Sequence, residues 1–176
     1  MCVRDNGEDA VAPRRSSAGR VAATVVLVLA CLLVVAADQT SKAWALAHSH
    51  ARHTLVPGLV STTFAVNTGA TFGFFAGKAL VLAAVSMVIL VAVLLLWWFE
   101  ARVSLVASLG VGFLAGGALG NLYDRVARGF VVDFLRFDFA PWWPAFNAAD
   151  AATVLGVILV AGWLWLAHTP ASAVRD

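Results

Sequence analysis

Four apolar runs, each free of Asp, Glu, Lys and Arg, constrain this chain more than any other feature. They cover residues 21–37, 79–99, 103–119 and 151–168. Crossing about 30 Å of hydrocarbon takes roughly 20 apolar residues, and backbone groups away from water must pair within a helix. The chain is 61% hydrophobic and 12% charged, whereas soluble domains are about 25% charged. The sequence therefore predicts an all-α integral membrane protein with four transmembrane helices.

The arginines indicate how these spans are oriented. Arg14, Arg15 and Arg20 precede the first span, and basic residues beside the first helix usually mark the cytoplasmic side. An even number of spans returns the chain to its starting side, so both termini are expected in the cytoplasm. The two long loops, 38–78 and 120–150, are then expected on the outer side of the membrane.

The first span also resembles a secretory signal, because basic residues precede an apolar run. That run continues beyond Cys31 to Ala37, which favours an uncleaved helix over a removable signal. Residues 1–20 contain Gly, Pro, Ser and charges of both signs, which is typical of a disordered tail. We therefore expect one membrane domain over 21–168, a disordered cytoplasmic tail before it, and a second cytoplasmic tail over 169–176.

The outer loops carry two segments that differ from the spans. Residues 54–75 combine Thr, Val and Phe with Pro and Gly, a composition that predicts short strands and turns and hence a small extracytoplasmic β-cradle. Residues 130–139 form an amphipathic, Phe-rich run that is expected to lie at the membrane interface, with Asp138 facing water. The aromatic stretch 139–146 is expected to anchor this loop at the same depth.

Charge and histidine content argue against two other kinds of site. A net charge of +2 is too small to indicate nucleic-acid binding. The histidines form no convincing set of metal ligands, and those at 48–53 are interpreted as part of a solvated loop. They are His48, His50, His53 and His168.

Polar residues gather beside the span ends. Asp38 and Lys42 are four residues apart with the acid first, which favours an ion pair on an extension of the first helix. Asn67 and Gly69 are typical turn residues. Taken alone, each of these pairs has a purely structural interpretation.

A second polar group arrives where the third span ends. It contains Asn121, Asp124 and Arg125. The adjacent charges favour a structural ion pair between Asp124 and Arg125. We therefore predict that Asp124 acts mainly in stability.

Two further aspartates, Asp133 and Asp150, indicate chemistry. Asp133 stands among apolar residues, where burial disfavours the charged form and raises the pKa. Asp150 falls in the first turn of the fourth span, where Asn147 can cap the helix and the backbone dipole favours a carboxylate. Ionisable groups at a bilayer edge are commonly functional. Two carboxylates that converge there can share one proton and hydrolyse a peptide bond.

Two other classes of protein stay open at this point. A proton-coupled carrier also uses intramembrane carboxylates, although carriers commonly hold them near the midplane between repeats. A non-enzymatic membrane scaffold would use the polar clusters to pack its helices.

The order of five short motifs adds a resemblance to a known family. They are Asp38-Gln39-x-x-Lys42, Asn67-x-Gly69-Ala70-x-Phe72-Gly73, Gly116-Gly117-Ala118-x-Gly120-Asn121-x-x-Asp124-Arg125, Val131-Val132-Asp133-Phe134 and Phe146-Asn147-x-Ala149-Asp150. Set between four correctly spaced spans, they resemble the lipoprotein signal peptidases (signal peptidase II) over residues 20–168. Thr71 is a small departure, since the family often has Ala there.

The resemblance implies an aspartyl endopeptidase of the bacterial cytoplasmic membrane, with Asp133 and Asp150 as the catalytic pair near the outer face. It implies supporting or substrate-binding roles for Asp38, Lys42, Asn67, Gly69, Asn121, Asp124, Arg125, Asn147 and Ala149. The substrates would be diacylglyceryl-modified prolipoproteins, cut before the lipidated cysteine. No metal or organic cofactor and no nucleic acid are implied, and a monomer embedded in membrane lipid is expected.

Overall fold

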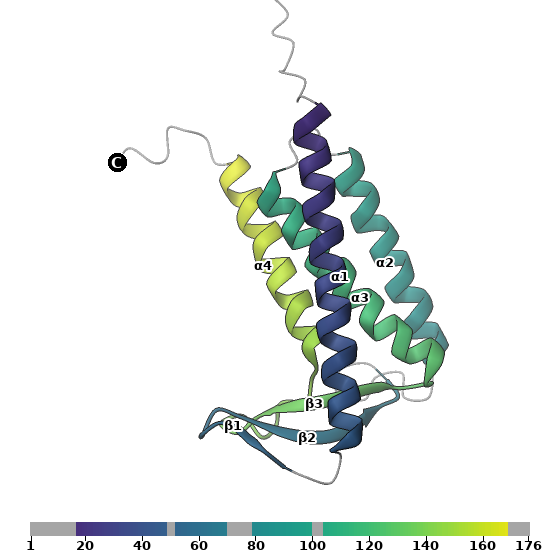
Figure 1. The fold of residues 1–176 in the computed structure, drawn as a ribbon, viewed down its shortest axis with the longest axis vertical. Helices are drawn as coiled ribbons and strands as arrows, with labels where there is room; N and C mark the ends of the chain where they lie inside the picture. The colour runs from purple at the N-terminus through teal and green to yellow at the C-terminus, as the bar shows by residue number, and fades with distance from the viewer. Residues whose placement is uncertain (1–16, 49–51, 70–78, 100–103, 169–176) are drawn as a thin grey trace, which may run out of the picture.

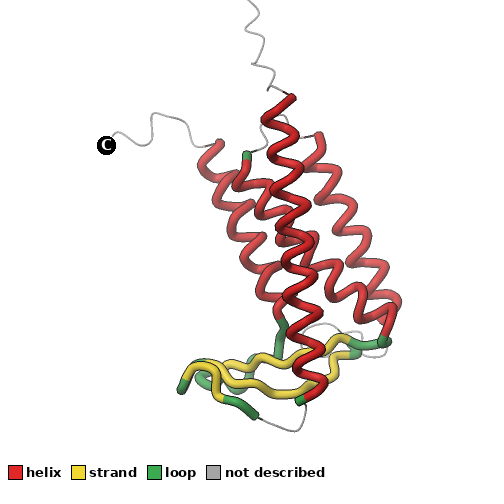
Figure 2. The backbone as a smooth tube through the Cα atoms, viewed as in Figure 1, coloured by secondary structure: helices red, strands yellow, loops and turns green. Residues whose placement is uncertain are grey.

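The computed structural model describes residues 17–48, 52–69, 79–99 and 104–168. Within these ranges four helices lie side by side as a bundle (Figures 1 and 2). They are α1 Ser17–Ala47, α2 Ala79–Phe99, α3 Leu105–Ala127 and α4 Ala148–His168. Each is long and apolar enough to cross a membrane. The prediction of an integral membrane protein with four such helices is confirmed.

Helix α1 is longer than the apolar run that predicted it. It begins at Ser17, inside the segment expected as a tail, and continues past Asp38 and Lys42 to Ala47. Both charged side chains are fully buried and lie 2.8 Å apart, so the expected ion pair on a helical extension is confirmed. The remaining parts of the expected tails, 1–16 and 169–176, lie outside the described residues.

Helix α3 approaches its neighbours closely because it carries glycines at the contacts. A Cβ atom at Gly112 would lie 2.6 Å from the carbonyl oxygen of Leu27 in α1, and one at Gly117 would lie 2.5 Å from that of Ala149 in α4. Small residues at such positions let membrane helices pack backbone to backbone. The contact at Gly117 sets the first turn of α4, and with it Asp150, against α3.

A small antiparallel sheet closes one end of the bundle (Figure 1). Its strands are β1 Thr54–Val56, β2 Val60–Asn67 and β3 Val131–Phe137, in the order β1-β2-β3. Between β2 and β3, Asn67 pairs with Val131 and Ala65 with Asp133. The predicted sheet in the first loop is thus confirmed over 54–67, while its expected continuation over 70–75 lies outside the described residues.

The 130–139 run, expected as an interfacial amphipathic segment, contributes strand β3 to this sheet. Val132 and Phe134 are buried and form a cluster with Ala45 near the end of α1. Strand β2 offers this run a hydrogen-bonding edge, and α1 offers it an apolar surface. Together they bury apolar side chains that were expected at the membrane interface.

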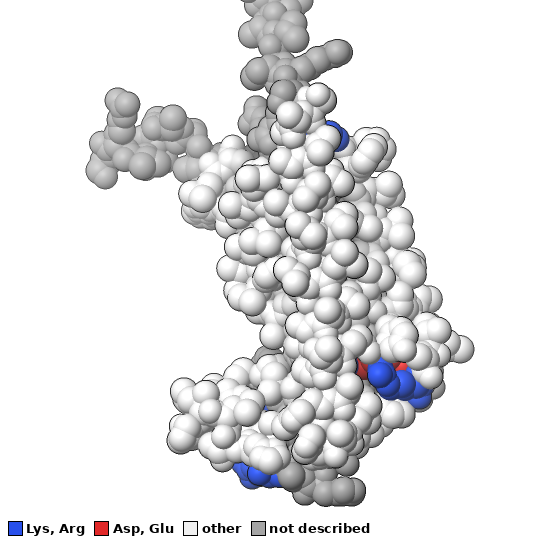
Figure 3. All heavy atoms as spheres, viewed as in Figure 1, with Lys and Arg blue, Asp and Glu red and all other residues white. Residues whose placement is uncertain are grey.

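The two ends of the bundle differ in character. The start of α1 and the end of α4 lie together at the end opposite the sheet (Figure 1). Between the two ends of the bundle, the visible face in Figure 3 carries no charged side chains. Large apolar side chains such as Leu33 and Leu80 are 69% and 74% exposed. An apolar outer surface of this kind matches a hydrocarbon environment. The described polar residues concentrate near the sheet.

Candidate active site

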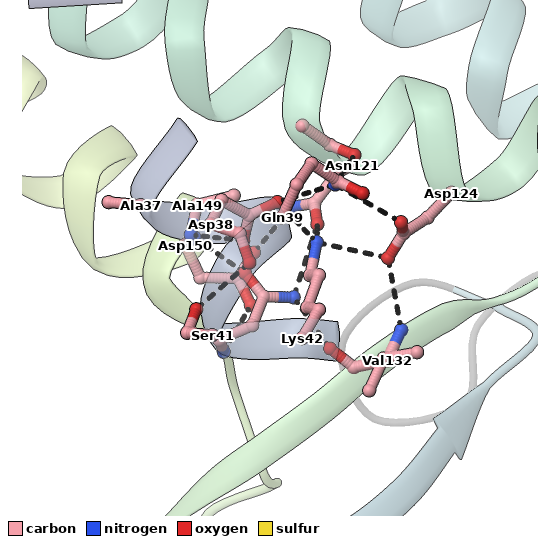
Figure 4. A network of polar contacts seen from close by, with 12 residues as sticks. Ala37, Asp38, Gln39, Ser41, Lys42, Asn121, Asp124, Val132, Ala149 and Asp150 are labelled. Carbon is pink, nitrogen blue, oxygen red and sulfur yellow. Dashed lines mark hydrogen bonds and ion pairs between the residues drawn. The ribbon is translucent and has the colours of Figure 1, made fainter. Parts of the chain in front are cut away.

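The residues singled out by the sequence converge where α1, α3 and α4 meet the sheet (Figure 4). Asp38 and Lys42 come from α1, Asn67 from β2, Asn121, Asp124 and Arg125 from α3, Asp133 from β3, and Ala149 and Asp150 from the first turn of α4, which Asn147 precedes. Gly69 follows β2, and its N–H donates to Oδ1 of Asn67 at 3.0 Å. The expected turn at Asn67 is confirmed, and it presents the Asn67 amide to the site.

Asp133 is held by two side-chain amides. Its Oδ2 accepts from Nδ2 of Asn67 at 2.9 Å, and its Oδ1 accepts from Nδ2 of Asn147 at 2.7 Å. Only 3% of the residue is exposed. Burial raises the pKa of Asp133 from 3.8 to about 6; the Asn67 hydrogen bond opposes this rise and the charge of Asp150 adds to it. Asp133 therefore titrates close to neutral pH.

Asp150 is held by the helix cap and by α3. Its Oδ2 accepts from the backbone N–H of Asn147 at 3.1 Å, while its own N–H donates to Oδ1 of Asn147 at 3.0 Å. This reciprocal cap stabilises the start of α4, as the sequence predicted. Its Oδ1 accepts from Nδ2 of Asn121 at 2.8 Å. Because Asn147 also donates to Asp133, one residue joins the two carboxylates.

A buried lysine lies beside Asn121, the residue that binds Asp150 (Figure 4). Nζ of Lys42 lies 2.8 Å from Oδ2 of Asp38, 3.0 Å from Oδ2 of Asp124 and 3.0 Å from Oδ1 of Asn121. The lysine and both acids are fully buried. Since the amide oxygen of Asn121 faces the ammonium group, its NH₂ group is directed to Asp150. Lys42 thus fixes the orientation of the amide that binds Asp150.

Asp38 links this lysine to the last helix. Its Oδ1 accepts from the backbone N–H of Ala149 at 3.0 Å, which satisfies one of the unpaired donors at the start of α4. Ala149 is fully buried, so a larger side chain has no space there. Asp38 and Ala149, which are far apart in sequence, therefore together join α1 to the start of α4.

The partner predicted for Asp124 is wrong. Asp124 pairs with Lys42 and with Arg128, and its Oδ2 also accepts from the N–H of Val132 at 3.2 Å. Arg125 forms no salt bridge with it. Successive side chains on a helix point in different directions, whereas residues four apart share a face, so Arg128 was the helical partner that the spacing could have revealed.

Asp138 also differs from the expectation that it simply faces water. Its side chain is only 20% exposed and lies 2.7 Å from both Nη2 of Arg52 and Oγ of Ser61. The Ser61 hydrogen bond, with the Arg52 contacts, lowers the pKa of Asp138. Asp138 therefore ties the end of β3 to β2 and to the segment before β1, and it takes no part in the group around Asp133.

Both central carboxylates line one cavity of about 1070 Å³. Asn67, Asn121 and Arg125 complete its polar wall. Its apolar wall includes Val131, Phe137, Phe146, Val154 and Leu155. In Figure 3 the outline steps inward where the sheet projects beyond the helices. A cavity with apolar walls and a few convergent polar groups is the usual form of a binding site.

In the described part of the chain no group of three or more His, Cys, Asp or Glu side chains is placed to hold a metal ion. His48 stacks on Trp44 with ring centroids 4.9 Å apart, and His53 lies 5.6 Å from the same ring. His50 lies outside the described residues. The described histidines at 48–53 therefore form an aromatic cluster beside the sheet.

The sequence matches the family of Signal peptidase (SPase) II over residues 30–166. The chain belongs to this family. A lipoprotein signal peptidase of Syntrophomonas wolfei is 41% identical over 131 residues, which cover 73% of this chain and 85% of that protein. One of Clostridium novyi is 34% identical over 141 residues, covering 78% and 95%.

Two solved structures share this fold. Two bacterial membrane enzyme structures match with TM-scores of 0.72 each and identities of 29% and 31%, covering 84% and 82% of this chain and 93% and 95% of theirs. The chain is thus a peptidase of the signal peptidase II family and a multi-pass bacterial membrane protein.

Proposed function

We propose that the chain is an aspartyl endopeptidase that removes signal peptides from diacylglyceryl-modified prolipoproteins by hydrolysing the bond before the lipidated cysteine. One observation carries this proposal: Asp133 and Asp150 both bond to Asn147 and both line the same cavity. The substrate class is supported by the relatives, which are lipoprotein signal peptidases.

The chemistry follows from two carboxylates joined through one amide. Ionising both in a buried site is unfavourable, so the pair holds one proton near neutral pH. A pKa of about 6 for Asp133 supports this state. The ionised carboxylate accepts a proton from the attacking water, and the protonated one donates to the scissile carbonyl oxygen. The pair titrates as a unit, so the proton belongs to both residues.

The walls of the cavity suit an apolar, lipid-borne substrate. Val154 and Leu155 belong to α4 and are themselves 59% and 50% exposed, so this wall of the cavity continues into the apolar outer surface of the helix. In the proposed arrangement both termini are cytoplasmic, the site lies near the outer face, and a single copy surrounded by lipid is active. Phe139 and Trp142, which are 64% and 71% exposed, anchor the loop before α4 at that depth.

The supporting residues have distinct proposed tasks. Asn67, Asn121 and Asn147 orient the carboxylates, and Gly69 sets the turn that carries Asn67. Asp38, Lys42, Asp124 and Ala149 hold the helix ends around them. The proton-coupled carrier that the sequence left open is disfavoured, because the central carboxylates lie at helix ends beside a sheet, whereas carriers commonly place them near the midplane.

A gel-shift assay on a lipidated preprolipoprotein tests the proposal. Purified wild type is expected to cut the substrate, and Asp133→Asn and Asp150→Asn to lose activity by about 10²–10⁴-fold, the usual contribution of a general acid or base. Asp138→Asn is the matched control, because it removes a carboxylate from the same loop without touching the cavity.

Three results would count against the proposal. If folded wild type leaves the substrate uncut, the proposed peptidase activity is wrong. If a folded Asp133→Asn or Asp150→Asn variant cleaves at the wild-type rate, the proposed aspartyl mechanism is wrong. Equal losses in Asp138→Asn would show that the assay reports disruption of the loop rather than chemistry.

A further inference from the structure

Arg125 places a guanidinium group on the cavity wall, and none of the contacts described so far gives this group a role. It is partly buried near the end of α3. Its Nη1 donates to the carbonyl oxygen of Asn121 and its Nη2 to that of Gly69, each at 3.4 Å. Both distances exceed the range of about 2.7–3.2 Å that is usual for N–H···O hydrogen bonds. The five donors of the group are therefore poorly used.

Within the described ranges the charge of Arg125 also lacks a bonded counter-charge. Among the described residues Lys42, Arg52 and Arg128 each form a salt bridge, but Arg125 forms none. It experiences the charges of Asp150, Asp133 and Asp124 without contacting them. The neighbouring segment 70–78 contains no Asp or Glu. A partly buried cation without a bonded anion is costly and has donors to spare for a ligand.

The position of Arg125 ties it to both central carboxylates. One of its acceptors is the backbone of Asn121, whose side chain binds Asp150. The other is Gly69, whose N–H is bound by Asn67, and the amide of Asn67 binds Asp133. The guanidinium therefore borders the same part of the cavity as the two residues that would perform hydrolysis.

Hydrolysis creates a new anion at this place. Water adds across the peptide bond, so that the C–N bond breaks and a C–O bond forms. The leaving nitrogen takes one proton and becomes an amine, and the new carboxylic acid passes its own proton to that amine, which leaves a carboxylate and an ammonium group. This carboxylate forms beside two acidic side chains that share a negative charge, which repel it. Arginine matches a carboxylate with two parallel hydrogen bonds.

We propose that Arg125 is the binding site for the new carboxylate of the released signal peptide. This inference rests on the proposed function, since it takes the product of that reaction as its ligand. The peptide acid is held in the cavity by Arg125 and competes with the next substrate until it leaves. Intact substrate has an uncharged carbonyl at this position and cannot form the same ion pair.

The test compares two synthetic signal peptides that end at the residue before the lipidated cysteine, one as the free acid and one as the carboxamide. Binding to the full-length protein in detergent is titrated directly near neutral pH, and inhibition of cleavage is measured in parallel. The acid is expected to bind at least about tenfold more tightly, as a charged hydrogen-bonded pair would give. In Arg125→Gln the ratio is expected to fall to about one, because the charged pair that produces it is lost.

Two further variants separate this role from general charge and from stability. Arg125→Lys keeps the charge but loses the two-pronged geometry, so it should keep part of the preference for the acid. Arg136→Gln is the matched control, since it removes a positive charge from the same outer segment but lies off the cavity wall, and it should keep the full preference. Thermal unfolding checks that each variant is folded.

The outcomes are decisive in either direction. Equal binding of acid and carboxamide to the wild type would overturn the inference without any variant. So would a full preference for the acid in Arg125→Gln, or its loss in Arg136→Gln. If wild type cleaves its substrate but binds acid and carboxamide equally, the proposed product site is wrong and the proposed peptidase activity is retained. If it does not cleave, the proposed function fails, while the direct titration still measures the acid site.

Discussion

Nδ2 of Asn147 lies 2.7 Å from Oδ1 of Asp133, while the backbone N–H of the same asparagine binds Asp150. The residue that caps the start of α4 therefore also connects the two carboxylates. Secondary structure and site geometry depend here on one side chain, and they can be separated by mutation.

Asn147→Ser and Asn147→Ala are expected to differ in stability but not in activity. Serine retains an oxygen that can cap α4, whereas alanine loses the cap at a cost of about 1 kcal/mol. Both lose the amide that binds Asp133, so both should lose at least about tenfold in turnover. Thermal unfolding and the cleavage assay measure the two effects. Full activity in the serine variant would show that the amide contact with Asp133 is dispensable.

The stability of the protein should depend on pH through Asp133. Its pKa rises from 3.8 to about 6 on folding, so the native state binds the proton more tightly than the unfolded chain. The ionised carboxylate lowers the free energy of unfolding above pH 6, and this penalty disappears as the pH falls to 3.8. Relative to wild type, Asp133→Asn should therefore gain up to about 3 kcal/mol between the low and the high end of this range. Unfolding in detergent across this range measures the gain, and a pH-independent difference would contradict it.

The pH profile of cleavage should respond to Asn67. Its hydrogen bond lowers the pKa of Asp133, so Asn67→Ala should raise that pKa and move the corresponding inflection of kcat/KM to higher pH. Profiles of wild type and variant, each normalised to its own maximum, show the direction. An inflection that stays in place or moves to lower pH would argue against Asp133 as the titrating group.

Removal of the buried lysine should destabilise the fold far more than removal of a surface cation. Lys42→Met leaves Asp38 and Asp124 buried without their shared partner, which costs about 3–5 kcal/mol. Arg52→Met breaks the pair with Asp138, in which the arginine is 65% exposed, and should cost at most about 1 kcal/mol. Comparison of the two unfolding curves tests this difference. Similar losses would mean that water or rearranged side chains replace the buried ammonium group.

The close contact between α3 and α4 should tolerate no added methyl group. Gly117→Ala places a Cβ atom 2.5 Å from the carbonyl oxygen of Ala149, so the start of α4 must move and both stability and cleavage should fall. Gly162→Ala in α4 meets nothing within 4 Å and should be neutral or stabilising by up to about 1 kcal/mol. Unaltered activity in a folded Gly117→Ala variant would show that Asp150 tolerates a shift of its helix.

The sequence predicted the parts of the fold that depend on local composition. Charge-free apolar runs are sufficient to recognise spanning helices, and the Pro and Gly punctuation of 54–75 predicted strands there. Strand β3 was harder to predict from the sequence, because its burial pattern does not alternate: Val131 through Phe134 are all buried. Only contacts with β2 and α1, which are distant in sequence, give that run its place.

The side-chain partners at the site were harder to predict than the residues themselves. Adjacency suggested that Asp124 pairs with Arg125, but the structure pairs it with Lys42 and Arg128. The i,i+4 spacing to Arg128 was readable in the sequence, whereas the contact to Lys42 depends on how α1 packs on α3. Likewise Arg52, the partner of Asp138, belongs to a different loop.

The order in which the chain is made gives the position of Asp150 a further meaning. Asp133 precedes the last helix, but Asp150 lies within its first turn. A growing chain therefore lacks Asp150 until α4 has been made, and Asp150 takes its place only when α4 packs against α3. Under the proposed mechanism a copy in which α4 is not yet packed on α3 is inactive, so proteolysis waits for the whole bundle to assemble.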